Sequence, residues 1–113
     1  MKLEDLDNYS LQVTEKYQRF YYSSEAQIIK NETTEYELKK GVEIPTSCGF
    51  LQISDYLMDG DEIIGVRIDY YDSNYEIKSA KITLDQGDTI RLMEGNPDIY
   101  RISDCTFKIV ENK

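Results

Sequence analysis

The feature that most restricts the fold is an alternation of apolar and polar residues between residues 63 and 110. Successive side chains of a β-strand point to opposite faces of a sheet, so a period of two predicts strands. The first run consists of Ile64, Val66, Ile68 and Tyr70. Clusters of turn-forming residues interrupt the alternation roughly every ten to twelve residues, which is typical of an all-β sandwich or barrel.

The clearest predicted hairpin joins this first run, across a turn at residues 71–74, to the run that begins with Tyr75 and Ile77. The apolar positions then change from odd to even numbers near Ser79 and Ala80, which predicts a β-bulge or a bend between two strands there. Two further turns are expected at residues 85–88 and 94–98. Alternating runs follow each turn, beginning with Ile90 and with Tyr100, respectively.

The N-terminal half is less regular. β-Branched and aromatic residues favour a strand over residues 11–22, and the polar residues 30–34 indicate a turn. A short helical turn is expected near Leu3 and Leu6. Apolar residues at steps of three and four favour a helix over residues 47–59, with Gly60 suited to its C-terminal cap. The expected fold is mainly β, or β-rich α+β. It would be a small curled antiparallel sheet, partly closed barrel or sandwich, with at most one or two short helices.

The chain has 113 residues, a length that suits one domain covering residues 1–113. It begins without an apolar signal region and contains no apolar run long enough to cross a bilayer. We therefore expect a cytoplasmic protein in which Cys48 and Cys105 are free thiols, unless the fold brings them together as a disulfide. Cys105 is in phase with Phe107 and Ile109, so we expect it in the core.

The charge of the chain argues against two kinds of ligand. The net charge is −9, and eleven of the 22 acidic residues but only four of the 13 basic residues lie between residues 54 and 98. Proteins bind DNA or RNA largely by placing lysine and arginine against phosphates. Free nucleic acid and an anionic membrane surface are therefore unsuitable partners for this chain.

The residue types present do not indicate an enzyme. The chain has no histidine, and thus lacks the usual general base and the commonest zinc ligand. Neighbouring carboxylates could in principle serve in glycoside hydrolysis or calcium binding, but neither a fixed cleft spacing nor the ligand pattern of a calcium loop is visible. Aspartate is common in turns because it bonds its own backbone. We therefore expect no catalytic residue, metal or cofactor. The acidic groups considered are Asp59, Asp61 and Glu62; Asp69 and Asp72; and Asp85 and Asp88.

Gly65 lies inside the first alternating run, where a glycine is unusual. A glycine in a strand marks a bulge or a close approach of another backbone. We expect one of these two features at Gly65.

Tyrosines and acidic residues occur together around the predicted hairpin. Tyrosine provides a large rigid contact surface, and clustered acids attract a basic partner and speed its capture. A plain solvated face that keeps the protein soluble is the alternative interpretation. The candidate partner-binding residues are Asp59, Asp61, Glu62, Asp69, Tyr70, Tyr71, Asp72, Tyr75 and Glu76.

These observations favour a non-enzymatic acidic binding protein that blocks a basic surface on a nuclease or another nucleic-acid-binding protein. Two roles suit its size and charge. One is a phage or mobile-element inhibitor of a host nucleic-acid enzyme, of the anti-CRISPR or anti-restriction type, and the other is an immunity protein against a basic toxin. A homodimer is compatible with either role. The alternatives are a structural or assembly module of a phage or secretion system and a β-barrel that binds a small molecule.

Overall fold

The computed structural model describes residues 1–21, 25–72, 74–96 and 99–112. The predicted turns at 71–74 and 94–98 contain Ser73, Pro97 and Asp98, and the predicted strand over 11–22 ends at Tyr22; these four residues lie outside the described part. A short 3₁₀ helix, η1 (Leu3–Asn8), confirms the helical turn expected near the start of the chain. The strands that follow are β1 (Tyr9–Tyr21), β2 (Gln27–Glu37), β3 (Glu43–Thr46), β4 (Gly49–Asp59), β5 (Glu62–Tyr71), β6 (Ile77–Thr83), β7 (Thr89–Asn96) and β8 (Ile99–Glu111).

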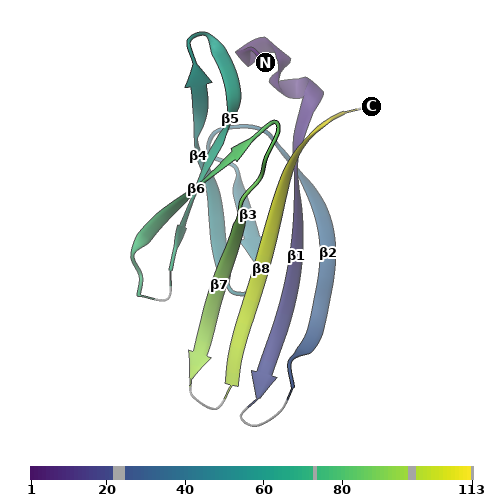
Figure 1. Cartoon of the computed structure of the whole chain (residues 1–113), viewed down its shortest axis with the longest axis vertical. Helices are drawn as coiled ribbons and strands as arrows, with labels where there is room; N and C mark the ends of the chain where they lie inside the picture. Colours follow the sequence, from purple (N-terminus) through teal and green to yellow (C-terminus); the bar gives the residue numbers. More distant parts are fainter. Residues whose placement is uncertain (22–24, 73, 97–98, 113) are drawn as a thin grey trace.

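The strands form two antiparallel sheets of four strands each, packed as a sandwich (Figure 1). The first sheet has the strand order β2-β1-β8-β7, and the second has the order β3-β4-β5-β6. The sheets do not close into a barrel. The predicted mainly β fold is therefore confirmed, and of the forms considered the sandwich is the one observed.

The core lies between the sheets and is built mainly from the inward-facing positions of the strands, with Leu6 of η1 and Leu38, which follows β2, added to it. Burial of such apolar side chains provides the main stabilisation of a sandwich. Cys105 is completely buried among them, as its phase with Phe107 predicted. The largest fully buried apolar side chains are Leu11, Leu38, Ile44, Leu51, Ile53, Ile63, Val66, Ile68, Ile82 and Ile90.

The helix predicted over residues 47–59 is wrong, because this segment contains strand β4. Leu51 and Ile53 alternate as in any strand and are fully buried. Ser54 is then an extra residue, since the β4–β5 register jumps from Ile53 to Asp55. The bulge changes the inward positions from odd to even numbers, and Tyr56 packs against the core. The bulge thus separates the inward residues Ile53 and Tyr56 by three positions, and this spacing resembles the period of a helix.

A second bulge shifts the phase of β5. The register passes from Gly65 to Ile63, so Ile64 is the extra residue. Ile63 is 1% exposed whereas Ile64 is 39% exposed, which corrects the apolar run that the sequence began at Ile64. An added Cβ on Gly65 would lie 2.0 Å from the carbonyl oxygen of Ile82. The bulge and the close backbone approach expected at this glycine are both confirmed.

The predicted hairpin after residue 70 is confirmed as the antiparallel pair β5–β6. The bulge expected at Ser79 and Ala80 is wrong, because the register runs without a break from Gly65 paired with Thr83 to Tyr71 paired with Ile77. The phase change arose because Tyr75 and Ile77 do not face the core. Both side chains are exposed, at 87% and 65%, respectively.

The turn predicted at residues 30–34 is also wrong. These residues continue strand β2, which pairs with β1 at the edge of the first sheet. Most β2 side chains are exposed. A strand exposed on both faces needs no apolar alternation, so its polar sequence resembled a turn.

The two sheets differ in length, and this difference shapes one end of the molecule. The long pair β1–β8 runs from Tyr9 opposite Glu111 to Tyr21 opposite Ile99. In Figure 1, β1, β8 and β7 extend beyond the end of the second sheet, where β5 and β6 join. The inner face of the first sheet is therefore not fully covered at this end.

Candidate functional site

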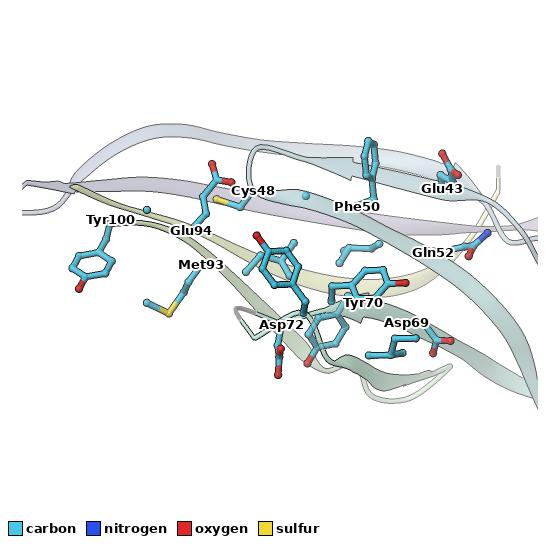
Figure 2. A pocket seen from close by; sticks show the side chains of 17 residues that line it. Glu43, Cys48, Phe50, Gln52, Asp69, Tyr70, Asp72, Met93, Glu94 and Tyr100 are labelled. Carbon is cyan, nitrogen blue, oxygen red and sulfur yellow. The ribbon is translucent and has the colours of Figure 1, made fainter. Parts of the chain in front are cut away.

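A groove of about 820 Å³ lies at this open end, between the two sheets (Figure 2). Its walls are the first residues of β4, the last residues of β5 with the turn that follows, and residues 92–95 of β7. Its volume is in the range of pockets that bind ligands. We call it the acid–aromatic groove, after the two kinds of side chain that dominate its lining.

Aromatic and other large apolar side chains form much of the lining. They are Phe50, Tyr70, Tyr71, Tyr75 and Tyr100, together with Leu51, Ile77, Leu92 and Met93. Tyr75 and Phe50 are 87% and 69% exposed, respectively. Exposed apolar residues are ordinary when scattered, but a concentration of them in one hollow marks a binding surface.

Four carboxylates line the same groove, and no lysine or arginine of the described chain does. Asp69 has an ion pair with Arg67 at 3.4 Å and accepts a hydrogen bond from the Ser79 hydroxyl at 2.6 Å. Glu94 pairs with Arg101 at 3.3 Å. The side chains of Glu43 and Asp72 have no ion pair among the described residues. The groove therefore keeps a negative charge that its neighbours only partly neutralise.

Asp72 organises the segment that carries Tyr75. Its carboxylate Oδ1 accepts hydrogen bonds from the backbone N–H of Asn74 at 2.9 Å and of Glu76 at 3.0 Å. Its carbonyl oxygen accepts another from the N–H of Tyr75 at 3.0 Å. Tyr75 has a φ of 61°, a left-handed conformation rare for residues other than glycine. Asp72 thus holds the exposed tyrosine at the mouth of the groove.

A buried carboxylate lies behind Cys48, at the inner wall of the groove. Glu15 of β1 accepts hydrogen bonds from the Ser47 N–H at 2.8 Å and from the Ser103 hydroxyl at 2.7 Å, and it lies 3.5 Å from the Lys30 ammonium. Burial raises the pKa of this carboxyl, but these donors and the ammonium outweigh it and the pKa is lowered. The interaction fixes the β3–β4 turn, and with it Cys48, against the first sheet.

Cys48 and Cys105 are both free thiols. Burial raises the pKa of Cys48, and it raises that of Cys105 to about 12. A thiolate is the reactive form of cysteine, so neither side chain is activated as a nucleophile.

The structure divides the predicted partner-binding residues into two groups. Five of them line the acid–aromatic groove: Asp69, Tyr70, Tyr71, Asp72 and Tyr75. Glu76 lies beside them but outside the lining, 3.5 Å from the Lys78 ammonium. Asp59, Asp61 and Glu62 lie at the β4–β5 turn, which is at the opposite end of β5 from the groove. Glu62 there pairs with the N-terminal ammonium at 2.9 Å.

Several groove residues were not predicted from the sequence. Glu43 and Phe50 come from the β3–β4 pair, and Met93, Glu94 and Tyr100 come from the β7–β8 pair. Phe50 did carry a signal, because it lies next to the buried Leu51 and therefore faces away from the core. Phe50 lines the same groove as residues of β7 because of how the two sheets pack, and a local sequence pattern cannot predict that packing.

The remaining acidic pairs do not assemble into a site. Asp85 and Asp88 are exposed, and Asp88 accepts a hydrogen bond of 3.4 Å from the Lys81 N–H. Among the described residues, no three cysteine, aspartate or glutamate side chains gather closely enough to hold a metal ion. No helix in the described ranges is long and apolar enough to cross a membrane.

Comparison of the chain with family models, curated proteins and solved structures found no match.

Proposed function

We propose that this chain is a non-enzymatic binding protein that captures and blocks a basic surface of another protein. The supporting observation is the composition of the acid–aromatic groove, which four carboxylates and five aromatic residues line without a lysine or arginine of the described chain. Carboxylates attract lysine and arginine, and a ring face binds their cationic heads by the cation–π interaction. The exposed rings add apolar contact area, which typically supplies most of the affinity at an interface.

The partner class we propose is a nuclease or another nucleic-acid-binding protein. Such proteins carry lysine and arginine in the channels that receive phosphates. A net charge of −9 favours encounter with a channel of this kind and repels free nucleic acid. Blocking such a channel is what either an inhibitor of a nucleic-acid enzyme or an immunity protein against a basic toxin would do.

The test compares two variants that carry the same change in net charge. The groove variant is Glu43→Lys/Asp69→Asn/Asp72→Asn, in which asparagine preserves the hydrogen bonds that Asp69 and Asp72 accept. The control variant is Asp59→Lys/Asp61→Lys, at the distant β4–β5 turn, where both side chains are exposed. Both variants raise the net charge by four. A difference in peptide binding between them must therefore come from the position of the substituted acids and not from the total charge.

Random-peptide display on the wild type, the groove variant and the control variant supplies the readout. We expect peptides selected on the wild type and on the control variant to be enriched in lysine and arginine, and those selected on the groove variant to lose this enrichment. Selected peptides without basic enrichment on the wild type, or equal enrichment on all three proteins, would refute the proposal.

A further inference from the structure

The acid–aromatic groove lies beside an unpaired strand edge. β7 is the last strand of the first sheet, and its residues 92–95 line the groove. Alternate residues of an edge strand direct their N–H and C=O groups away from the neighbouring strand. Within the described ranges, no backbone hydrogen bond from another segment covers the outer edge of β7. This edge can therefore accept a further strand.

The other edges of the sandwich are less suitable. β3 has only four residues and includes Pro45, which has no N–H to donate. The β6 edge is covered at its C-terminal part, because the Thr83 N–H donates to the carbonyl of Gln86 and the Lys81 N–H donates to Asp88. β2 is long and exposed, but it does not contribute to the acid–aromatic groove. Among the described edges, β7 combines free backbone groups with the longest run of groove-lining residues, residues 92–95, whereas β6 contributes only Ile77 to the lining.

The two faces of β7 have different chemistry. Leu92 and Glu94 face the groove between the sheets. On the other face, Met93 is paired with Ile102, and a second hollow of about 240 Å³ is lined by Phe20, Met93, Tyr100 and Ile102. Met93 and Tyr100 also line the groove, so they lie at the rim between it and this second hollow. A strand added beside β7 would place every second side chain toward the groove and the others toward this apolar hollow.

We propose that the partner presents an extended segment that pairs with the free edge of β7. Lysine or arginine occupies alternate positions of this segment and enters the acid–aromatic groove, where Glu94 and the rings of Tyr71 and Tyr75 receive it. Apolar residues occupy the positions between and lie beside Met93. The inference rests on the proposed function and specifies the conformation and pattern of the basic segment. Binding by strand addition uses main-chain hydrogen bonds for affinity and alternate side chains for specificity.

The probes are synthetic heptapeptides with capped ends. The first alternates lysine and valine, and the second has the same composition with the lysines grouped together. Two further peptides repeat the alternating sequence with N-methyl groups on either the lysines or the valines. In an extended chain the lysines share one face and their N–H groups point to one edge, while the N–H groups of the valines point to the other edge. With the lysines directed into the groove, only one of these edges meets β7. Only one of the two methylation patterns therefore removes the N–H groups that bond to β7. Isothermal titration gives each affinity, and amide chemical shifts of the protein locate the site.

We expect the alternating peptide to bind at least about tenfold more tightly than the grouped one, since the grouped peptide cannot divide its side chains between the two faces. One N-methylated peptide should lose at least about tenfold in affinity, and the other should bind like its parent, as expected when several hydrogen bonds are lost along one edge only. The largest changes in amide chemical shift on peptide binding should occur in β7.

Three outcomes would count against parts of this scheme. Equal affinity of both methylated peptides with the parent would overturn strand pairing and leave the proposed function standing. Shifts centred on β2 would overturn the assignment to β7. Failure of every lysine peptide to bind would count against the proposed function itself.

A matched pair of protein variants tests the same assignment. Met93→Lys places a positive charge on β7, at the rim shared by the groove and the second hollow, whereas Ile28→Lys places one on β2, the other edge strand of the same sheet. Both native side chains are exposed, at 43% and 59%, so both variants should fold. We expect Met93→Lys to weaken the alternating peptide at least about fivefold, because a lysine then opposes its valine positions and adds repulsion. Ile28→Lys should have no effect, and an equal loss in both would contradict the proposal.

Discussion

Tyr75 combines an unfavourable backbone with an exposed ring. Its φ of 61° is the only positive value of a non-glycine residue in the described chain. Such a conformation costs about 1–3 kcal/mol and persists only where the surroundings impose it. Here three hydrogen bonds to Asp72 impose it, and the ring gains no burial in return. Because this strain brings no packing benefit, we propose that the ring of Tyr75 contacts the partner.

Tyr75→Gly tests this interpretation. Glycine adopts positive φ without steric cost, so thermal unfolding should occur at the same temperature as in the wild type or at a slightly higher one. Affinity for the alternating lysine–valine peptide should fall about three- to tenfold, because one ring that receives the cation is lost. A lower melting temperature with unchanged affinity would show that the ring stabilises the fold instead.

The two thiols provide a second test at the scale of single residues. Cys48 lines the groove and is partly exposed, whereas Cys105 is buried and its pKa is raised to about 12. Alkylation with iodoacetamide at pH 8, followed by mass spectrometry, should therefore modify Cys48 slowly and leave Cys105 intact until the protein unfolds. Bound peptide should slow the modification of Cys48. Equal labelling with and without peptide would place the peptide outside the groove.

At the scale of elements, Glu15 connects parts of the sandwich that are distant in sequence. It lies on β1 and binds groups from β2, from the β3–β4 turn and from β8. A carboxylate this buried is stabilising only while its donors are in place. Removing its charge should therefore loosen the wall that carries Cys48.

Glu15→Gln should lower the free energy of unfolding by about 1–3 kcal/mol at pH 7. The amide oxygen can still accept from Ser47 and Ser103, but those bonds lose their charge and the amide NH2 cannot pair with the Lys30 ammonium. The pKa of Glu15 is lowered in the folded state, so its stabilisation is present above the unfolded value near 4.5 and is lost as the pH falls through the folded value. The difference between wild type and variant should shrink below about pH 4.5. Urea unfolding at several pH values measures it, and a gap that widens with acid would contradict this account.

Much of the fold could be predicted from alternation alone. The β5–β6 hairpin, the buried run at Ile90 and Leu92, and the position of Cys105 all follow from a period of two. Prediction failed where a bulge changed the phase, at Ser54 and at Ile64. A bulge leaves the composition of a strand unchanged, so local pattern cannot distinguish it from another element.

The candidate site could be predicted only in part, because it combines segments from both sheets. Tyr71 and Tyr75 were recognised because their turn is local in sequence. Glu43 and Glu94 meet them only through the packing of β3–β4 and β7 around the open end. Met93 was missed for another reason: it lies out of phase with the buried Ile90 and Leu92, and an exposed apolar residue in an alternating run carries no local sign of a groove.

At the scale of the whole molecule, the acidic residues do not form one surface. A strand rises about 3.3 Å per residue, so the ten residues of β5 separate its two ends by roughly 30 Å. The acids at the β4–β5 turn therefore lie well beyond the Debye length of about 8 Å from those in the groove at physiological salt. Under the proposed function, both groups of acids add to the long-range attraction of a basic partner, and the acids of the groove make the contacts.

This separation predicts different kinetic effects for the two variants of equal charge. Glu43→Lys/Asp69→Asn/Asp72→Asn and Asp59→Lys/Asp61→Lys both change the net charge from −9 to −5. At low salt, both should reduce the association rate of the lysine–valine peptide about two- to fivefold, because long-range attraction depends on total charge. Only the groove variant should also raise the dissociation rate, by about tenfold or more, since dissociation reports contacts. Stopped-flow fluorescence at two salt concentrations separates these effects, and a faster dissociation in the Asp59→Lys/Asp61→Lys variant would place the contact surface at the β4–β5 turn.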